Sequence, residues 1–229
     1  MRACLSCVVL AISCLGVLMS SAGAGDKLQG GDKVDRWTKD FAVEKDELVS
    51  TGRNPYFILE AGYTLVLEHG DERLVVTVLN ETKKVDGVEC RVIVENETKG
   101  GKEVEKSRNY FAISKRNNSV FYFGEDVGGA WLSGEKGAKF GLMMPGLPLL
   151  NATYYEEVAP GVAMDRAEIV SVSETVKTPA GEFKNCLKIE ETTPLEPGTK
   201  EYKYYARGIG LVQDGALKLV KYGNPNPAK

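Results

Sequence analysis

The most informative shortage in the sequence is histidine, because the 229 residues contain only one, His69. A single histidine excludes any metal or catalytic site that is built from two or more. The G-x-S-x-G elbow, the H-E-x-x-H zinc motif and the Walker phosphate loop are also missing. A Ser-His-Asp triad would have to use His69, which lies in the tight turn E-H-G-D and favours an exposed position. We therefore expect no catalytic residues of these classes and no bound cofactor.

A surplus of positive charge is missing as well. The chain carries 29 Lys and Arg residues against 32 Asp and Glu residues, which gives a formal net charge of -3. Proteins that bind nucleic acid need a basic surface that neutralises phosphates. This charge balance argues against nucleic acid as a main partner.

The N-terminal residues resemble a secretion signal. Arg2 is the only charged residue among the first 24, and an apolar run extends from Cys4 to Met19 before small residues that end at Ala24. This order is typical of a signal peptide over residues 1–24, so we expect a secreted or periplasmic protein. The run is short for a bilayer span of about 20 residues, and we expect no transmembrane span in the mature chain. The less favoured alternative is a lipoprotein anchored at Cys14.

Cysteine becomes scarce once the signal peptide is removed. Removing 24 of the 229 residues leaves 205 and takes away Cys4, Cys7 and Cys14. An even pair in an oxidising compartment is a disulfide candidate, so Cys90 and Cys186 could form a bridge. The alternative is two buried thiols in separate strands. Spacing cannot decide between them, because a bridge depends on the separation of the two Cα atoms.

Three regions follow the signal peptide. Residues 25–53 are interpreted as a flexible leader, in which the apolar spacing over residues 35–48 is compatible with a short helix. Residues 54–223 are expected to form a single β domain. Residues 224–229 are expected to form a disordered tail.

Apolar runs separated by short turns characterise the β domain. Residues 63–68 and 73–79 are two such runs with a glycine turn between them, which predicts a hairpin. Asp86-Gly87 and Gly100-Gly101 mark further turns. About ten runs of this kind predict an all-β fold, in which an antiparallel meander forms a sandwich or a partial barrel.

One segment breaks this pattern. Between Gly124 and Asp165 the sequence has eight glycines and three prolines among apolar and aromatic residues. Long irregular connections are often functional. We expect this Gly/Met/Pro-rich segment to cap the fold, either as a lid over an apolar cleft or as a loop that only closes a sheet edge. The lid would supply the ligand-binding residues, which are Trp131, Met143, Met144, Tyr154 and Tyr155.

Carboxylates flank the same segment. A possible carboxylate site would combine Glu125, Glu157, Asp165 and Glu168. Paired carboxylates can perform acid–base catalysis or bind a hard cation such as calcium. No D-x-D-x-D-G loop accompanies them, so any metal stays unknown. The alternative is that all four are solvated surface residues.

The run Y-Y-A-R-G-I-G-L-V at residues 204–212 resembles the closing motif Y-Y-A-x-G-x-G-L-V of a family of uncharacterised secreted bacterial β-sheet proteins. Further similar stretches are N-P-Y-F at 54–57, Y-F-G-E-D at 122–126 and P-G-V-A-M-D at 160–165. The likeness extends from residue 54 to about residue 213. By fold analogy, such proteins look like relatives of the lipoprotein carriers with a curved sheet. The resemblance implies a bacterial source and implies no catalytic residue.

These observations favour a non-catalytic binding or carrier module outside the cytoplasm, with an apolar cleft for a lipid or another apolar small molecule. The first alternative is a structural or interaction protein of the cell envelope, which would present an exposed sheet edge or apolar patch to an envelope protein. The second alternative is an enzyme that uses the carboxylates named above.

Overall fold

The computed structural model describes residues 35–126 and 130–224. The predicted signal peptide, the alternative anchor at Cys14 and the tail beyond Asn224 lie outside these residues. In the described part of the chain, no helix is both long and apolar enough to cross a membrane. The elements in chain order are η1 (Lys45–Glu47), β1 (Leu48–Val49), β2 (Gly52–Asn54), β3 (Phe57–Leu59), β4 (Thr64–His69), β5 (Glu72–Val85), β6 (Val88–Lys99), β7 (Lys102–Ser114), β8 (Val120–Glu125), β9 (Trp131–Leu132), β10 (Lys139–Met144), β11 (Thr153–Tyr155), β12 (Glu157–Val158), β13 (Arg166–Thr178), β14 (Gly181–Thr192), β15 (Glu201–Ala206), β16 (Gly210–Asp214) and β17 (Leu217–Gly223).

Fifteen of these strands form one antiparallel sheet, of which thirteen follow the order β11-β13-β14-β15-β16-β17-β4-β5-β6-β7-β8-β10-β12. The other two are β1, which pairs with β7, and β9, which pairs with β8. Most neighbours in the sheet are also consecutive in the chain, so the all-β meander that the sequence predicts is confirmed. The predicted hairpin is β4 and β5, in which Leu67 lies opposite Leu74. Both leucines are fully buried, because the period of two in a strand turns alternate side chains to the inner face.

Two of the long hairpins depend on the turns that the sequence marks. Asp86 and Gly87, between β5 and β6, have φ angles of 50° and 86°. Gly100 and Gly101, between β6 and β7, have φ angles of 58° and 75°. Two successive residues with positive φ are what a type I′ turn requires, and such a turn matches the twist of the strands it joins.

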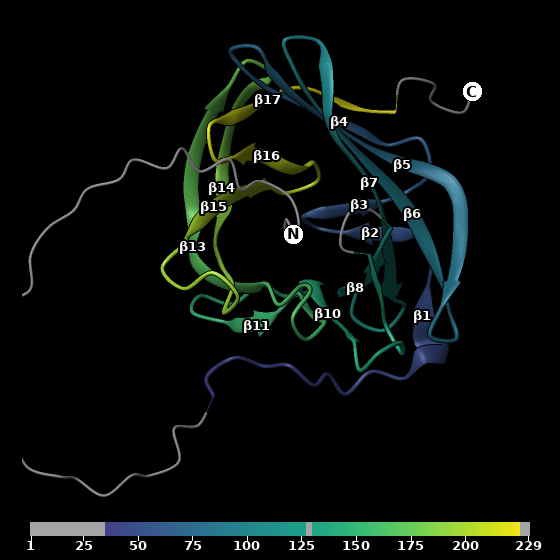
Figure 1. The fold of residues 1–229 in the computed structure, drawn as a ribbon. Coiled ribbons are helices and arrows are strands. Elements are labelled where there is room, and N and C mark those ends of the chain that lie inside the picture. Colours follow the sequence, from purple (N-terminus) through teal and green to yellow (C-terminus); the bar gives the residue numbers. More distant parts are fainter. Residues whose placement is uncertain (1–34, 127–129, 225–229) are drawn as a thin grey trace, which may run out of the picture.

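The sheet curls until its two edges nearly meet, which makes it an almost closed barrel (Figure 1). Its edge strands, β11 and β12, are separated in the chain by Glu156 alone. β11 pairs with β13, whereas β12 pairs with β10. The Gly/Met/Pro-rich segment therefore enters the wall as the short strands β9 to β12, and the partial barrel of the prediction is more nearly closed than expected.

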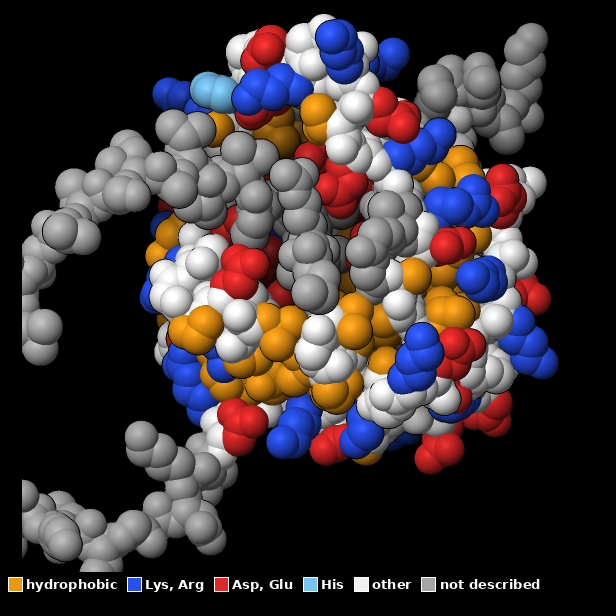
Figure 2. Space-filling model, in the orientation of Figure 1, with side chains coloured by type: hydrophobic (Ala, Val, Ile, Leu, Met, Phe, Trp, Pro, Cys, Tyr) orange, Lys and Arg blue, Asp and Glu red, His pale blue; other side chains and the backbone are white. Residues whose placement is uncertain are grey.

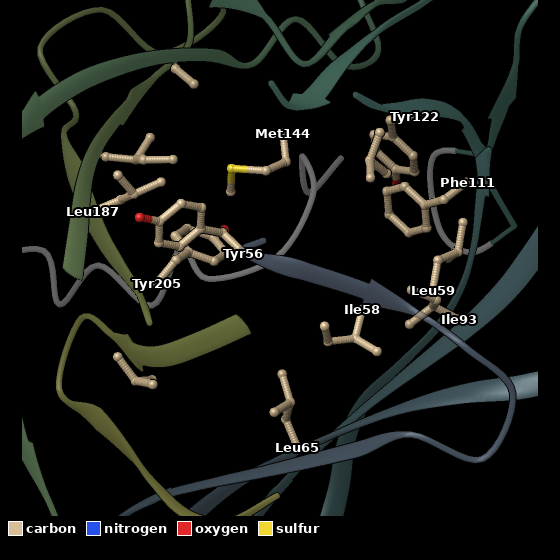
Figure 3. Packing of buried hydrophobic residues seen from close by; sticks show 14 of the residues in the cluster. Tyr56, Ile58, Leu59, Leu65, Ile93, Phe111, Tyr122, Met144, Leu187 and Tyr205 are labelled. Atoms are coloured by element: carbon tan, nitrogen blue, oxygen red, sulfur yellow. The ribbon is translucent and has the colours of Figure 1, made fainter. Parts of the chain in front are cut away.

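A hairpin and a large hydrophobic cluster occupy the inside of the barrel. Strands β2 and β3 pair only with each other and lie within the ring of the main sheet (Figure 1). Ile58 of β3 points toward Leu65 of the wall, and Tyr56 lies beside Tyr205 and below Met144 (Figure 3). All five side chains are at most 9% exposed. The hairpin therefore supplies the inner layer that a barrel of this width needs.

The leader covers the outside of the sheet. A second cluster, which includes Cys90, Tyr110 and Phe121, packs against Phe41 and Val43 of the leader. The helix expected over residues 35–48 is not found, and only the three-residue turn η1 is helical. The apolar side chains of the leader contact the outer face of β6 to β8 from an extended chain, and the ring centroids of Phe41 and Phe121 are 6.0 Å apart.

Closure of the barrel requires a residue without a side chain at position 141. A Cβ atom on Gly141 would lie 2.3 Å from the backbone oxygen of Glu156 and 2.6 Å from that of Tyr155. We expect Gly141→Ala to lower the free energy of unfolding by about 2–3 kcal/mol in urea titrations, because the backbone at the closure must move. Gly101→Ala is the control, since its Cβ atom would meet nothing within 4 Å and only its φ of 75° opposes it. A loss no larger than that of Gly101→Ala would contradict the close approach.

Candidate functional site

The barrel contains a cavity of about 80 Å³ that is partly open to solvent. Most of its wall is apolar and comes from the β2–β3 hairpin and from strands β4, β5, β6 and β16. Five aromatic rings contribute to the lining, from Tyr56, Phe57, Tyr63, Phe111 and Tyr205. We call this cavity the chamber. Its mixture of rings and aliphatic side chains is typical of small-molecule sites.

Three charged residues lie at the polar end of the chamber: Glu95 of β6, Lys203 of β15 and Asp214 of β16. Lys203 and Asp214 are opposite each other in the β15–β16 register. The Nζ atom of Lys203 lies 2.7 Å from Oε2 of Glu191, and both side chains are nearly buried. One lysine therefore faces carboxylates from both neighbouring strands.

More carboxylates continue behind this end of the chamber. The acidic cluster consists of Glu156, Glu157, Asp165, Glu191 and Asp214, arranged about Lys203. In the view of Figure 2, Asp and Glu side chains are visible within the ring of the barrel. Burial, followed by repulsion from Glu191, raises the pKa of Glu156 well above the ordinary value. Burial and then Asp165 and Glu156 do the same to the pKa of Glu157.

The acidic cluster keeps Lys203 in its charged form. Burial alone would lower its pKa, but the carboxylates of Glu191, Asp214 and Glu156 raise it well above the ordinary lysine value. A buried charge is tolerated only when it is paired and hydrogen-bonded. Lys203 is therefore the residue that allows several acids to share the interior.

Some buried oxygens of the cluster have no hydrogen-bond partner among the described residues. These are Oε1 of Glu156, Oε1 of Glu191 and the hydroxyl of Tyr154. Burial, followed by Glu156 and Glu191, raises the pKa of Tyr154 well above that of free tyrosine, which places the three groups near one another. In the same ranges of the chain, no group of three or more His, Cys, Asp or Glu residues is arranged to hold a metal ion.

The expected lid residues do not line one common cavity. Met143 lines the chamber, whereas Met144, Tyr154 and Tyr155 are buried in the wall. Trp131 is 4% exposed and meets the ring of Tyr122 edge-on at 5.1 Å. It also borders a separate, more polar hollow next to Glu125. Trp131 lies on β9, Met143 and Met144 lie on β10, and Tyr154 and Tyr155 lie on β11.

Three of the four candidate carboxylates come together. Oε1 of Glu157 accepts a hydrogen bond of 2.7 Å from the backbone N–H of Asp165. The negative charge of Glu125 contributes to the raised pKa of Glu157. Glu168 does not join them, because it forms an ion pair of 2.7 Å with Arg36. On β13, Ala167 and Ile169 are buried, so alternation turns Glu168 to the opposite face.

The sequence interpretation missed Glu95, Glu191, Lys203 and Asp214. A signal was present, since Glu191 continues the inward series of Leu187 and Ile189 on β14. Lys203 likewise alternates in phase with the buried Tyr205. A charged residue that follows the inward phase of a strand is the pattern to look for.

Cys90 and Cys186 are both free, buried thiols. Cys90 belongs to the outer cluster beneath the leader, and Cys186 belongs to the cluster inside the barrel. Burial raises the pKa of the Cys90 thiol to about 12. Of the two alternatives, the structure therefore has separate thiols and not the disulfide.

Exposed leucines gather in the connection between β10 and β11. Leu147, Leu149 and Leu150 are 76%, 61% and 53% exposed. Hydrophobic side chains are also concentrated on the β10–β11 side of the face in Figure 2. Apolar surface of this kind is the feature that an interaction protein would need.

Comparisons of the chain with protein-family models, with curated proteins and with solved structures give no match. No family is therefore identified for it. In the stretch that carries the resemblance to secreted bacterial proteins, the structure has β15, a turn that contains Gly208, and β16, which begins at Gly210. That arrangement establishes a strand, a turn and a strand in an all-β protein, and nothing finer.

Proposed function

We propose that this protein is a non-catalytic binding or carrier module that acts outside the cytoplasm and holds a small molecule inside its barrel. The observation that carries the proposal is the chamber, because it joins an apolar, ring-rich wall to a charged end. Barrels of moderate width hold one small ligand in this way. The N-terminal signal pattern and the resemblance to secreted bacterial proteins support the location and a place in the bacterial envelope.

The chamber suggests a different ligand contact from the one that the sequence predicts. Only Met143 of the expected set lines it, and the β2–β3 hairpin takes the place of the lid. The ligand would have an apolar body that fits between Ile58, Leu65 and Leu74. Its polar part would lie toward Glu95, Lys203 and Asp214, which is where the wall offers charge.

Filling the chamber tests this proposal. Leu211 is partly buried and lines the chamber, so Leu211→Trp should place an indole in it. We expect neohexyl alcohol, a small apolar probe, to shift the methyl NMR signals of Ile58 and Leu65 saturably in the wild-type protein. Leu211→Trp should weaken that binding at least about tenfold, a loss of roughly 1.4 kcal/mol.

Leu217→Trp is the matched control. Leu217 is also partly buried against the core, but it does not line the chamber. The control should bind the probe as the wild-type protein does. Equal weakening in both variants, or probe-induced shifts confined to other parts of the surface, would contradict a ligand site in the chamber.

A second candidate function is that of an interaction protein of the cell envelope. The exposed side chains of Leu147, Leu149 and Leu150 favour it, because three large apolar residues in one short connection are unusual on a surface. In that case the binding surface would be the β10–β11 connection, outside the barrel.

A further inference from the structure

The charge of the chamber limits which ligands suit it. Among its lining residues, Glu95 and Asp214 are acidic and Lys203 is basic. The charge of Lys203 is already shared by Glu191, at 2.7 Å, and by Asp214 on the neighbouring strand. Glu95 forms no ion pair within residues 35–126 and 130–224. When Glu95 is ionised, the polar end therefore presents a surplus of negative charge.

Aromatic rings complement this surplus. Tyr56 and Tyr205 lie side by side in the interior (Figure 3), and Phe57, Tyr63 and Phe111 line the same chamber. The faces of such rings attract organic cations, most strongly where water is excluded. Carboxylates together with aromatic rings are the usual means of binding a substituted ammonium group.

We propose that the ligand of the chamber is a small organic cation, in which an apolar body surrounds or adjoins an ammonium group that lies against Glu95 and Asp214. This inference rests on the proposed binding function and specifies its ligand class. An anionic ligand would have to approach Glu95 and Asp214 while Lys203, the one cation among the described lining residues, is already paired. A cation instead supplies the opposite charge that this end of the chamber lacks.

Proton release should accompany the binding. Burial raises the pKa of Glu95 to about 8, and the groups that face it are Lys203 on β15, Glu125 on β8, Asp214 on β16 and Glu97 on its own strand. Below that pH Glu95 holds a proton, which a bound cation must displace. The affinity for a permanent cation should therefore increase between pH 6 and pH 8 by up to about fiftyfold, because the ionised fraction of a group with a pKa of about 8 rises from about 1% to about 50% over that range.

The experiment compares three probes of one shape on the full chain by NMR titration at pH 8. Choline carries a permanent positive charge, and neohexyl alcohol is its uncharged carbon analogue. The third probe, tert-butylacetate (the carboxylate 3,3-dimethylbutanoate), carries a negative charge. We expect choline to bind at least about tenfold more tightly than neohexyl alcohol, which is a ratio that one charge in a partly desolvated site supplies. We expect tert-butylacetate to bind most weakly.

Variants of two glutamates on the same strand separate charge from shape. Glu95→Gln should reduce the affinity for choline about tenfold, remove its pH dependence and leave neohexyl alcohol unaffected. Glu89→Gln is the control, because Glu89 lies on the same strand but is exposed and does not line the chamber. It should bind choline as the wild-type protein does.

The outcomes distinguish the two proposals. If neohexyl alcohol binds in the chamber and choline binds equally or more weakly, the cation inference is wrong while the binding function stands. If none of the three probes binds in the chamber, both proposals fail. If choline binds elsewhere on the surface, its affinity should be unchanged by Glu95→Gln, and that result would also overturn the inference.

Discussion

Replacing Lys203 with methionine should lower the free energy of unfolding by about 3–5 kcal/mol at pH 7. Methionine keeps most of the volume of the side chain but leaves Glu191 and Asp214 without their cation. Removing one partner of a buried ion pair is far more damaging than removing an exposed one, because the remaining charge stays desolvated. Urea titration monitored by the fluorescence of Trp37 and Trp131 would measure the change.

The matched control is Lys200→Met, directly before the same strand β15. Lys200 forms an ion pair of equal length, 2.7 Å, with Glu190, but the lysine side chain is 56% exposed. Exposed pairs contribute at most about 1 kcal/mol, so this variant should remain close to wild type. Similar losses for the two variants would mean that Lys203 does not neutralise the interior.

Acid offers a second test if Lys203→Met fails to fold at pH 7. At pH 5 the buried carboxylates hold their protons more fully, so the missing cation should matter less and the variant should regain stability relative to wild type. Combining Lys203→Met with Glu191→Gln should recover part of the loss at pH 7, because it removes the nearest unpaired charge. A variant that is equally unstable at both pH values, with no recovery in the double variant, would contradict the electrostatic explanation.

The hairpins of the sheet could be predicted because local signals specify them. Asp86-Gly87 and Gly100-Gly101 supply the positive φ angles of tight turns, and long strands of recognisable pattern follow each turn. The closure of the barrel had no such signal. Strands β11 and β12 have three and two residues, which is too short for alternation to be recognised. What determines them is the backbone contact beside Gly141, a property of the assembled sheet.

The candidate site shows the same division between local and distant information. The pattern around Glu125, Glu157 and Asp165 marked acids near one segment, and the structure does bring those three together. It could not reveal Lys203, because the lysine belongs to a strand about 40 residues further along the chain. Only closure of the barrel places β12 and β15 around one interior. From the sequence alone, a lysine among tyrosines in a strand is predicted to lie on the surface, because the opposite wall of the barrel is not known.

The stability of this protein should fall as the pH rises through the neutral range, whereas many proteins are most stable there. Burial and mutual repulsion raise the pKa values of Glu156, Glu157 and Glu191, and burial raises that of Glu95 to about 8. Above the ordinary glutamate pKa of 4.5, the folded chain then holds protons that the unfolded chain has released. The free energy of unfolding therefore decreases with pH, by about 1.4 kcal/mol per pH unit for each proton retained.

Groups with lowered pKa values act in a different pH range. Asp86 is paired with Lys45 and Glu190 with Lys200, and both carboxyls have pKa values below the ordinary value. Their stabilisation is present above the ordinary carboxyl pKa and is lost in acid. In the neutral range, the change of stability with pH is therefore determined by the buried acids. Lys203, whose pKa is raised, contributes constantly until the pH passes the ordinary lysine value of 10.5.

Glu156→Gln should make the protein more stable at pH 8 by about 1–2 kcal/mol and leave it nearly unchanged at pH 5. The substitution removes a carboxylate whose Oε1 atom has no partner among the described residues, and it relieves the repulsion with Glu191. Glu103→Gln on the exposed part of β7 is the control and should have no effect at either pH. Urea midpoints measured at both pH values would give the comparison. A stabilisation that is equal at pH 5 and pH 8 would show that packing, and not the charge of Glu156, limits the stability at this position.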